Sequence, residues 1–100
     1  MLMEFTFYPY ERKNVEKVEE GWGIYKLADD LKKIIFIGRG NIKKHLFKHL
    51  PDGPEPAEDA KYFSIEYYDS GEDAYEAWEE MVRNHNRKFG KYPEYNQPMD

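Results

Sequence analysis

The sequence predicts an α+β fold: a small, mostly antiparallel sheet of three or four strands that contains a β-hairpin and is flanked by helices. Three observations lead to this class. The 100 residues suffice for one domain. Short β-prone runs alternate with segments of helical periodicity. Nine tyrosines, six phenylalanines and two tryptophans supply the large side chains that so small a core needs. We expect one domain over residues 1–100, with a strand and helix extension over 1–20 and a motif-bearing core over 21–96.

The N-terminal extension predicts one strand and one short helix. Residues 5–8 form an aromatic, β-prone run that Pro9 closes. Residues 10–20 are polar and carry Val15 and Val18 at a helical spacing, which favours a short helix or an ordered loop ending at Gly21.

The next segment predicts the central hairpin and a basic helix. Two apolar runs, residues 23–27 and 33–37, flank five residues with the composition of a turn. We expect Arg39 and Gly40 to break the second strand. Asn41 is a suitable N-cap for a helix whose apolar and histidine positions recur at helical spacing, namely Ile42, His45, Leu46, His49 and Leu50.

The second half predicts a loop, a strand and a long helix. Three prolines between residues 51 and 56 predict a loop that is free to move. Residues 62–68 alternate as a strand does, and a helix is expected from Ser70 to about Lys88, stopped by Gly90. A terminal segment with two tyrosines, over residues 92–96, is expected to dock on the domain.

Charge is distributed unevenly along the chain. The net charge is −5, yet the segment from Leu31 to Leu50 carries six cations, two histidines and no acid, whereas residues 52–80 carry eleven acids and one cation. The basic segment indicates either a solvated helix face or a site for the phosphates of DNA or RNA, with Lys43, Lys44 and Lys48 as the contacts. The absence of cysteine excludes disulfide scaffolds and thiol catalysis. With no long apolar run and no signal-peptide order in residues 1–5, we expect a cytoplasmic protein that does not enter a membrane.

Three groups of residues stand in an order that carries a family resemblance. The first hairpin run contains Gly23, Ile24 and Tyr25, and the second contains Phe36, Ile37 and Gly38. The helix that follows bears His49, and a Pro-Glu-Tyr-Asn segment ends at Asn96. In this order and spacing the chain resembles the GIY-YIG nuclease superfamily over most of its length. The resemblance implies a domain of that α+β type.

The resemblance also implies a phosphodiesterase site with one divalent metal ion, Mg²⁺ or Mn²⁺. In that family a helix glutamate holds the metal, an arginine stabilises phosphate charge, and tyrosine phenols position or deprotonate water. These roles suit an in-line displacement at phosphorus, which needs positive charge against the developing negative charge. Carried onto this sequence, they imply the catalytic candidates Tyr25, Arg39, His45, His49 and Glu79, with Glu79 as the metal ligand.

The sequence departs from the family pattern at three positions. The second motif of the family, which residues 36–38 resemble, begins with a tyrosine, and Phe36 lacks the phenol of that tyrosine. The family's arginine falls on His45, which is not a permanent cation, although Arg39 could supply charge from another angle. The position four residues after Ala74, where the metal-binding glutamate is expected, is Trp78. Glu79 follows it and is turned by about 100° around the helix axis, so it can hold a metal only if the helix register differs.

The same residues also have purely structural interpretations. Gly23 and Gly38 could be strand-end glycines, and Tyr25 and Trp78 could be core residues rather than cleft residues. His45 and His49 have the spacing of two zinc ligands but no evident third, which favours a hydrogen-bonded core histidine at position 49. Asn96 could tie the C-terminal segment to the sheet.

These observations favour a GIY-YIG-like domain with an eroded catalytic set. Such a domain would be a weak or inactive nuclease that acts as a nucleic-acid or protein binding module. One alternative is an active, metal-dependent endonuclease with a rearranged site. Another is a regulatory subunit that binds a protein partner through exposed aromatic residues.

Overall fold

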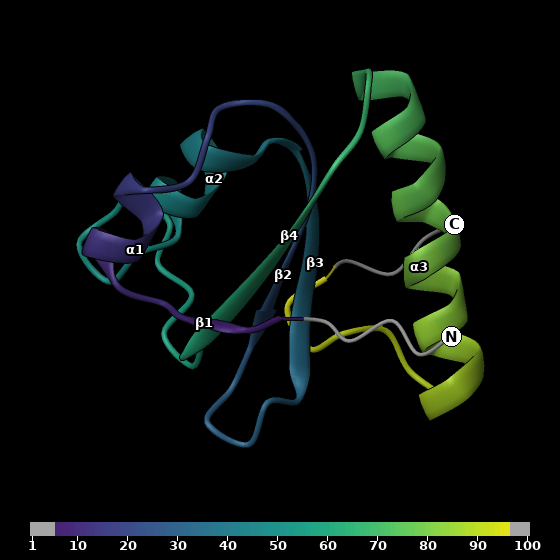
Figure 1. Cartoon of the computed structure of the whole chain (residues 1–100). Coiled ribbons are helices and arrows are strands. Elements are labelled where there is room, and N and C mark those ends of the chain that lie inside the picture. Colours follow the sequence, from purple (N-terminus) through teal and green to yellow (C-terminus); the bar gives the residue numbers. More distant parts are fainter. Residues whose placement is uncertain (1–5, 97–100) are drawn as a thin grey trace.

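The structure is a computed structural model that describes residues 6–96, and within this range it contains one antiparallel sheet and three helices (Figure 1). The strand order in the sheet is β1-β4-β2-β3. Helices α1 and α2 cover one face of the sheet and α3 covers the other (Figure 1). The predicted α+β class is confirmed. In chain order the elements are β1 (Tyr8–Pro9), α1 (Arg12–Glu16), β2 (Trp22–Ala28), β3 (Ile34–Asn41), α2 (Ile42–Lys48), β4 (Tyr62–Tyr67) and α3 (Gly71–Phe89).

Two apolar clusters, one on each face of the sheet, form the core. Successive residues of a strand point to opposite faces, so neighbours on β2 enter different clusters. Ile24 packs with Val82 under α3, while Tyr25 packs with Leu46 under α2. The larger cluster lies on the side of α1 and α2 and includes Val15 and Val18, as their spacing predicts.

The hairpin is longer than predicted. Strand β3 continues through Arg39 and Gly40 to Asn41, which pairs with Trp22. The expectation that Arg39 and Gly40 break the strand is therefore wrong. Gly40 has a φ of 123°, which a glycine adopts without steric cost, and it lies opposite Gly23, so the two strands stay paired.

The first strand is shifted relative to its prediction. β1 comprises Tyr8 and Pro9, which pair with Phe63 and Tyr62, whereas residues 6 and 7 lie before it and Phe5 lies outside the described residues. Pro9 is tolerated because β1 is an edge strand, where a missing N–H need not interrupt a ladder.

The helix caps agree with the sequence. The side chain of Asn41 accepts a hydrogen bond from the backbone N–H of Lys44, and Ser70 caps α3 in the same way through Asp73. Gly90 ends α3 with a φ of 74°. Helix α2 ends at Lys48, two residues earlier than predicted. None of the helices over residues 6–96 is long and apolar enough to cross a membrane.

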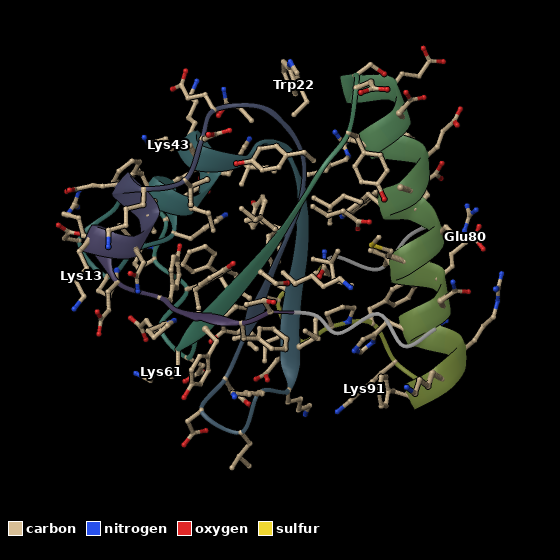
Figure 2. All side chains as sticks on the ribbon, in the orientation of Figure 1. Lys13, Trp22, Lys43, Lys61, Glu80 and Lys91 are labelled. Carbon is tan, nitrogen blue, oxygen red and sulfur yellow. The ribbon has the colours of Figure 1, made fainter. Side chains whose placement is uncertain are left out.

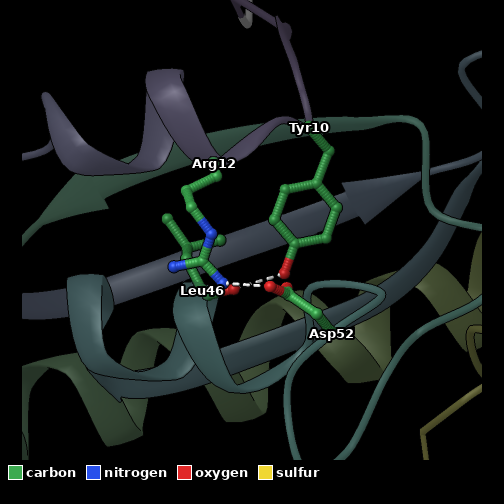
Figure 3. A network of polar contacts seen from close by, with 4 residues as sticks. All are labelled: Tyr10, Arg12, Leu46 and Asp52. Atoms are coloured by element: carbon green, nitrogen blue, oxygen red, sulfur yellow. Dashed lines mark hydrogen bonds and ion pairs between the residues drawn. The ribbon is translucent and has the colours of Figure 1, made fainter.

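The loop after α2, predicted to move freely, is held at several points. Arg12 of α1 forms a 2.6 Å ion pair with Asp52 of the loop. Beside it, the Tyr10 hydroxyl donates a 2.6 Å hydrogen bond to the carbonyl oxygen of Leu46 in α2 (Figure 3). The backbone N–H of Ala57 donates to the carbonyl oxygen of His49. These contacts join α1, α2 and the loop into one layer and fix the loop beside the cavity described next.

Candidate functional site

A cavity of about 610 Å³ lies where the β2–β3 hairpin, α2 and α3 meet. Helix α2 and the following loop contribute one wall, and α3 and the C-terminal segment contribute another. Most of the residues singled out from the sequence line it. The lining residues are Trp22, Tyr25, Phe36, Ile37, Gly38, Arg39, Gly40, His45, Lys48, His49, Glu55, Trp78, Tyr95 and Asn96.

Tyr25 lies at the base of this cavity and depends on Gly38. The two residues are cross-strand neighbours in the hairpin. A Cβ atom at position 38 would lie 2.1 Å from Cζ of Tyr25 and 2.4 Å from its hydroxyl oxygen. The tyrosine ring therefore crosses the β3 backbone where no side chain stands. This explains why a glycine is needed in the second motif.

The phenol of Tyr25 is hydrogen-bonded to an imidazole whose proton position is fixed. His49 Nδ1 lies 2.8 Å from the carbonyl oxygen of Glu55, and His49 Nε2 lies 3.2 Å from the hydroxyl oxygen of Tyr25. A carbonyl oxygen only accepts, so Nδ1 carries the proton that it donates to Glu55. In the neutral ring Nε2 is then the acceptor, and the Tyr25 hydroxyl donates to it.

Burial favours the neutral forms of the two residues at the cavity base. Burial raises the pKa of Tyr25 well above its ordinary value of 10.0, and the charge of Glu55 adds to the effect. The His45 ring stacks on Tyr25 with 5.9 Å between ring centroids. Burial lowers the pKa of His45, and the neighbouring cations, Lys48 first, lower it further. The phenol is therefore a hydrogen-bond donor at neutral pH and the imidazole of His45 is uncharged.

Arg39 supplies the permanent positive charge of the cavity. Its guanidinium carbon lies 4.4 Å from the ring centroid of Tyr75 and 5.1 Å from that of Trp78, both on α3. These cation–π contacts hold the guanidinium at the cavity wall, and because aromatic rings carry no net charge they do not neutralise it. Lys48 contributes a second cation, which forms a 3.0 Å ion pair with Glu55.

Trp78 occupies the place on α3 where the resemblance to GIY-YIG nucleases implied a carboxylate. Its indole N–H donates a 2.6 Å hydrogen bond to the carbonyl oxygen of Ile37, and the side-chain amide of Asn96 donates to the same oxygen at 3.0 Å. The amide oxygen of Asn96 accepts from the backbone N–H of Ile37 at 2.8 Å. Asn96 therefore ties the C-terminal segment to the outer edge of β3, as one sequence interpretation expected.

Glu79 lies outside the cavity. It is not among the lining residues, and its carboxylate pairs with Arg83 on the same helix at 3.3 Å. Among residues 6–96, the one carboxylate that lines the cavity, that of Glu55, is already paired with Lys48. Over residues 6–96, no three histidine or acidic side chains are grouped so that they could hold a metal ion. The residues at this cavity do not fit Mg²⁺ or Mn²⁺, and His45 and His49 have no third partner for zinc.

The remaining residues predicted from the sequence to contact nucleic acid or to form the motifs do not line the cavity. Lys43 points away from it, because its ammonium group donates to the carbonyl oxygen of Glu16 on α1. Lys44 is likewise not a lining residue. Gly23 lies against the carbonyl oxygen of Glu66 in β4, and Ile24 is buried under α3. These two motif residues build the sheet rather than the cavity.

Sequence reasoning missed two contributors to the site. Glu55 offers its backbone carbonyl oxygen to His49, a role for which no side-chain signal exists. Trp22, which stands directly before the first motif, is 52% exposed at the rim. One sign of this role was present in the sequence, namely that Trp22 directly precedes Gly23. An exposed aromatic residue beside a cleft is a common ligand contact.

Comparison with known proteins assigns the chain to a family without assigning an activity. The comparison with curated proteins found no match. Residues 1–88, which include all of the cavity except Tyr95 and Asn96, match the profile of a single family. The chain belongs to this family, which is described as a domain of unknown function, DUF7508.

Proposed function

We propose that this domain is a nucleic-acid binding module of GIY-YIG-like organisation, with weak or no phosphodiesterase activity. The observation that carries the proposal is the charge of the cavity. Arg39, Lys48 and two imidazoles face it, and because Lys48 pairs with the acid of the described lining, Glu55, the positive charge left uncompensated is that of Arg39. A polyanion gains from such a site because each phosphate that meets a cation releases condensed counterions.

The aromatic residues of the cavity favour a nucleic acid over a simple anion. Trp22 and Tyr75 are exposed, and Trp78 forms part of the wall. Aromatic rings beside a guanidinium provide stacking surfaces for bases next to a contact for phosphate. The guanidinium of Arg39 is held in place by its two rings, so binding costs little further ordering of that side chain.

Three features support weak or absent cleavage. The Tyr25 phenol stays protonated at neutral pH, so it is a poor base toward water. Phe36 has no phenol, and the carboxylate of Glu79 is engaged with Arg83 outside the cavity. The groups at the cavity can bind and orient a phosphate, whereas the phenol that meets the His49 imidazole stays protonated at neutral pH.

Fluorescence anisotropy with labelled single-stranded, duplex and branched oligonucleotides tests the proposal. Arg39→Gln should weaken binding by about tenfold and reduce the slope of log affinity against log salt by about 0.7 to 0.9, the value of one phosphate contact. Arg83→Gln is the matched control, since this guanidinium is on α3 but pairs with Glu79 away from the cavity. Equal affinities for the two variants would refute the proposal.

A second candidate is the metal-dependent endonuclease with a rearranged site. The hydrogen bond between Tyr25 and His49 favours it, because an imidazole acceptor is what a phenol needs to lose its proton. Cleavage that requires Mg²⁺ or Mn²⁺ and is abolished by Glu79→Ala would establish this candidate. A binding module should retain its affinity in the same variant.

A third candidate is a regulatory subunit for a protein partner, which the exposed rings of Trp22 and Tyr67 favour. Salt-dependent binding of the isolated domain to an oligonucleotide would count against this candidate.

A further inference from the structure

A second cavity lies at the opposite end of the β2–β3 hairpin, near the last turn of α3. Its volume is about 450 Å³, which is sufficient for one nucleotide-sized group. None of its lining residues belongs to the cavity described above. They are Lys32, Lys33, Ile34, His85, Phe89 and Lys91.

This cavity is positively charged. Three lysines line it, and in the described part of the chain no acidic residue does. The hairpin turn holds two acids, Asp29 and Asp30, and neither lines the cavity; the carboxylate of Asp29 accepts hydrogen bonds from the backbone N–H groups of Leu31 and Lys33. Asp29 is therefore committed to holding the turn. Lys88 does not line the cavity, but its ammonium nitrogen lies 5.3 Å from the ring centroid of Phe89.

An exposed phenylalanine and a partly buried histidine pack together at this cavity. Phe89 is 57% exposed, and its ring centroid lies 4.6 Å from that of His85. His85 Nδ1 lies 3.0 Å from the carbonyl oxygen of Lys91, so this nitrogen is the donor and the imidazole orientation is fixed. A large exposed ring held against a second ring is costly to leave in water and is suited to stacking with a flat ligand.

We infer that this second cavity binds an unpaired nucleotide of a single-stranded nucleic acid. The base would stack on Phe89, and the lysines would contact the flanking phosphates. Only an unpaired base can place its face on a protein ring, so the inference adds a preference for single strands over duplexes. It rests on the proposed function only for the identity of the polyanion, because the residues that carry it are different.

An anionic membrane surface is the other partner that lysines beside apolar groups can indicate. Leu31 is exposed at the tip of the hairpin, as a membrane contact would be. However, Leu31 does not line the cavity, and the rings stand at a half-open hollow rather than on a flat surface. The geometry therefore favours a single base over a lipid layer.

The experiment measures the affinity of the full chain for a labelled oligothymidylate and for a duplex of the same length. Phe89→Ala should weaken single-strand binding by between about fivefold and a hundredfold, the range for loss of one stacked base, and leave duplex binding little changed. Phe89→Tyr should retain the affinity because it keeps the ring. Lys91→Ala should lower the salt slope by about 0.7. Lys13→Ala is the control, since Lys13 lies on α1 on the other side of the sheet from Lys91 (Figure 2).

The outcomes separate this inference from the proposed function. If Arg39→Gln weakens binding while Phe89→Ala and Lys91→Ala bind as the wild type does, the inference fails and the proposed function stands. If only the Phe89 and Lys91 variants weaken binding, the inference stands and the first cavity is not the nucleic-acid site. No binding of the wild-type chain to either oligonucleotide overturns both. Binding to phosphatidylserine vesicles that Leu31→Ser abolishes, without loss of oligonucleotide affinity in Phe89→Ala, also overturns the inference.

Discussion

Replacing Gly38 with alanine tests whether the Tyr25 ring is held over the β3 backbone as described. A Cβ at this position would lie 2.1 Å from Cζ, 2.4 Å from the hydroxyl oxygen and 2.6 Å from Cε1 of Tyr25. Tyr25 is only 2% exposed and packs against Phe36 and His45, so its ring has little room to move aside. The ring would be pushed toward α2, and the hydrogen bond to His49 would break.

The expected loss of stability follows from three contributions. Overpacking of this kind costs about 1 to 3 kcal/mol. Loss of the hydrogen bond between Tyr25 and His49 costs about 0.5 to 1.5 kcal/mol. Alanine is about 0.5 to 1 kcal/mol better than glycine within a strand, which acts in the opposite direction. The free energy of unfolding should therefore fall by about 2 kcal/mol, within a range of roughly 0.5 to 4 kcal/mol.

Urea unfolding followed by circular dichroism measures this change, and a double-mutant cycle assigns it to the ring. In a Tyr25→Leu background no atom occupies the Cζ position, so Gly38→Ala should become neutral or slightly stabilising. The expected coupling energy between the two positions is about 2 to 3 kcal/mol. Gly71→Ala is a control, because the nearest side-chain atom to its added Cβ is 3.7 Å away, on Trp22. A coupling energy below about 0.5 kcal/mol would refute this account of the second motif.

Three further predictions concern the edge of β3 and the titrating groups. Asn96→Ala leaves the backbone N–H of Ile37 without its side-chain acceptor, so the free energy of unfolding should fall by about 1 to 3 kcal/mol. Hydrogen exchange of the Ile37 amide should accelerate, and an unchanged exchange rate would contradict the role of Asn96. Because burial raises the pKa of Tyr25, the unfolded chain loses this proton first above pH 10.0, and stability should fall there with a contribution of about 1.4 kcal/mol per pH unit. Tyr25→Phe should reduce that slope in urea unfolding, and equal slopes in the two proteins would show that the phenol is not buried. Burial and nearby cations lower the pKa of His45 from its ordinary value of 6.5, whereas the negative charge of a bound phosphate favours the protonated ring, so oligonucleotide affinity should rise as the pH falls below neutrality. His45→Gln should flatten this dependence, and an unchanged pH profile would place the phosphate elsewhere.

Local signals were sufficient for most of the fold. Asn41 and Ser70 cap helices through their own side chains, and Gly90 ends α3. Each of these helix ends could therefore be predicted from one residue and its neighbours in the sequence. The extension of β3 through Arg39 and Gly40 could not be predicted from its own segment. It depends on Gly23 lying across from Gly40, which is a property of two strands rather than of one segment.

The candidate site was predictable where it depends on side-chain spacing. Trp78, four residues after Ala74, faces the cavity, and Glu79 is turned to the flank, as one residue of helix rotation requires. Spacing could not show that the indole of Trp78 bonds to Ile37, nor that the carbonyl of Glu55 sets the tautomer of His49. Both contacts use backbone oxygen atoms, which every residue offers equally.

The contact between Asn96 and β3 bears on where this domain can be cut. The family profile ends at residue 88, whereas the segment that contacts the outer edge of β3 includes Tyr95 and Asn96. A fragment trimmed to the matched residues would expose the backbone groups of Ile35 and Ile37 along an apolar strand. Exposed strand edges pair readily with a second chain, so such a fragment should self-associate through β3. It would also lack Tyr95 and Asn96, which line the first cavity, so its failure to bind a ligand would say nothing about the full chain.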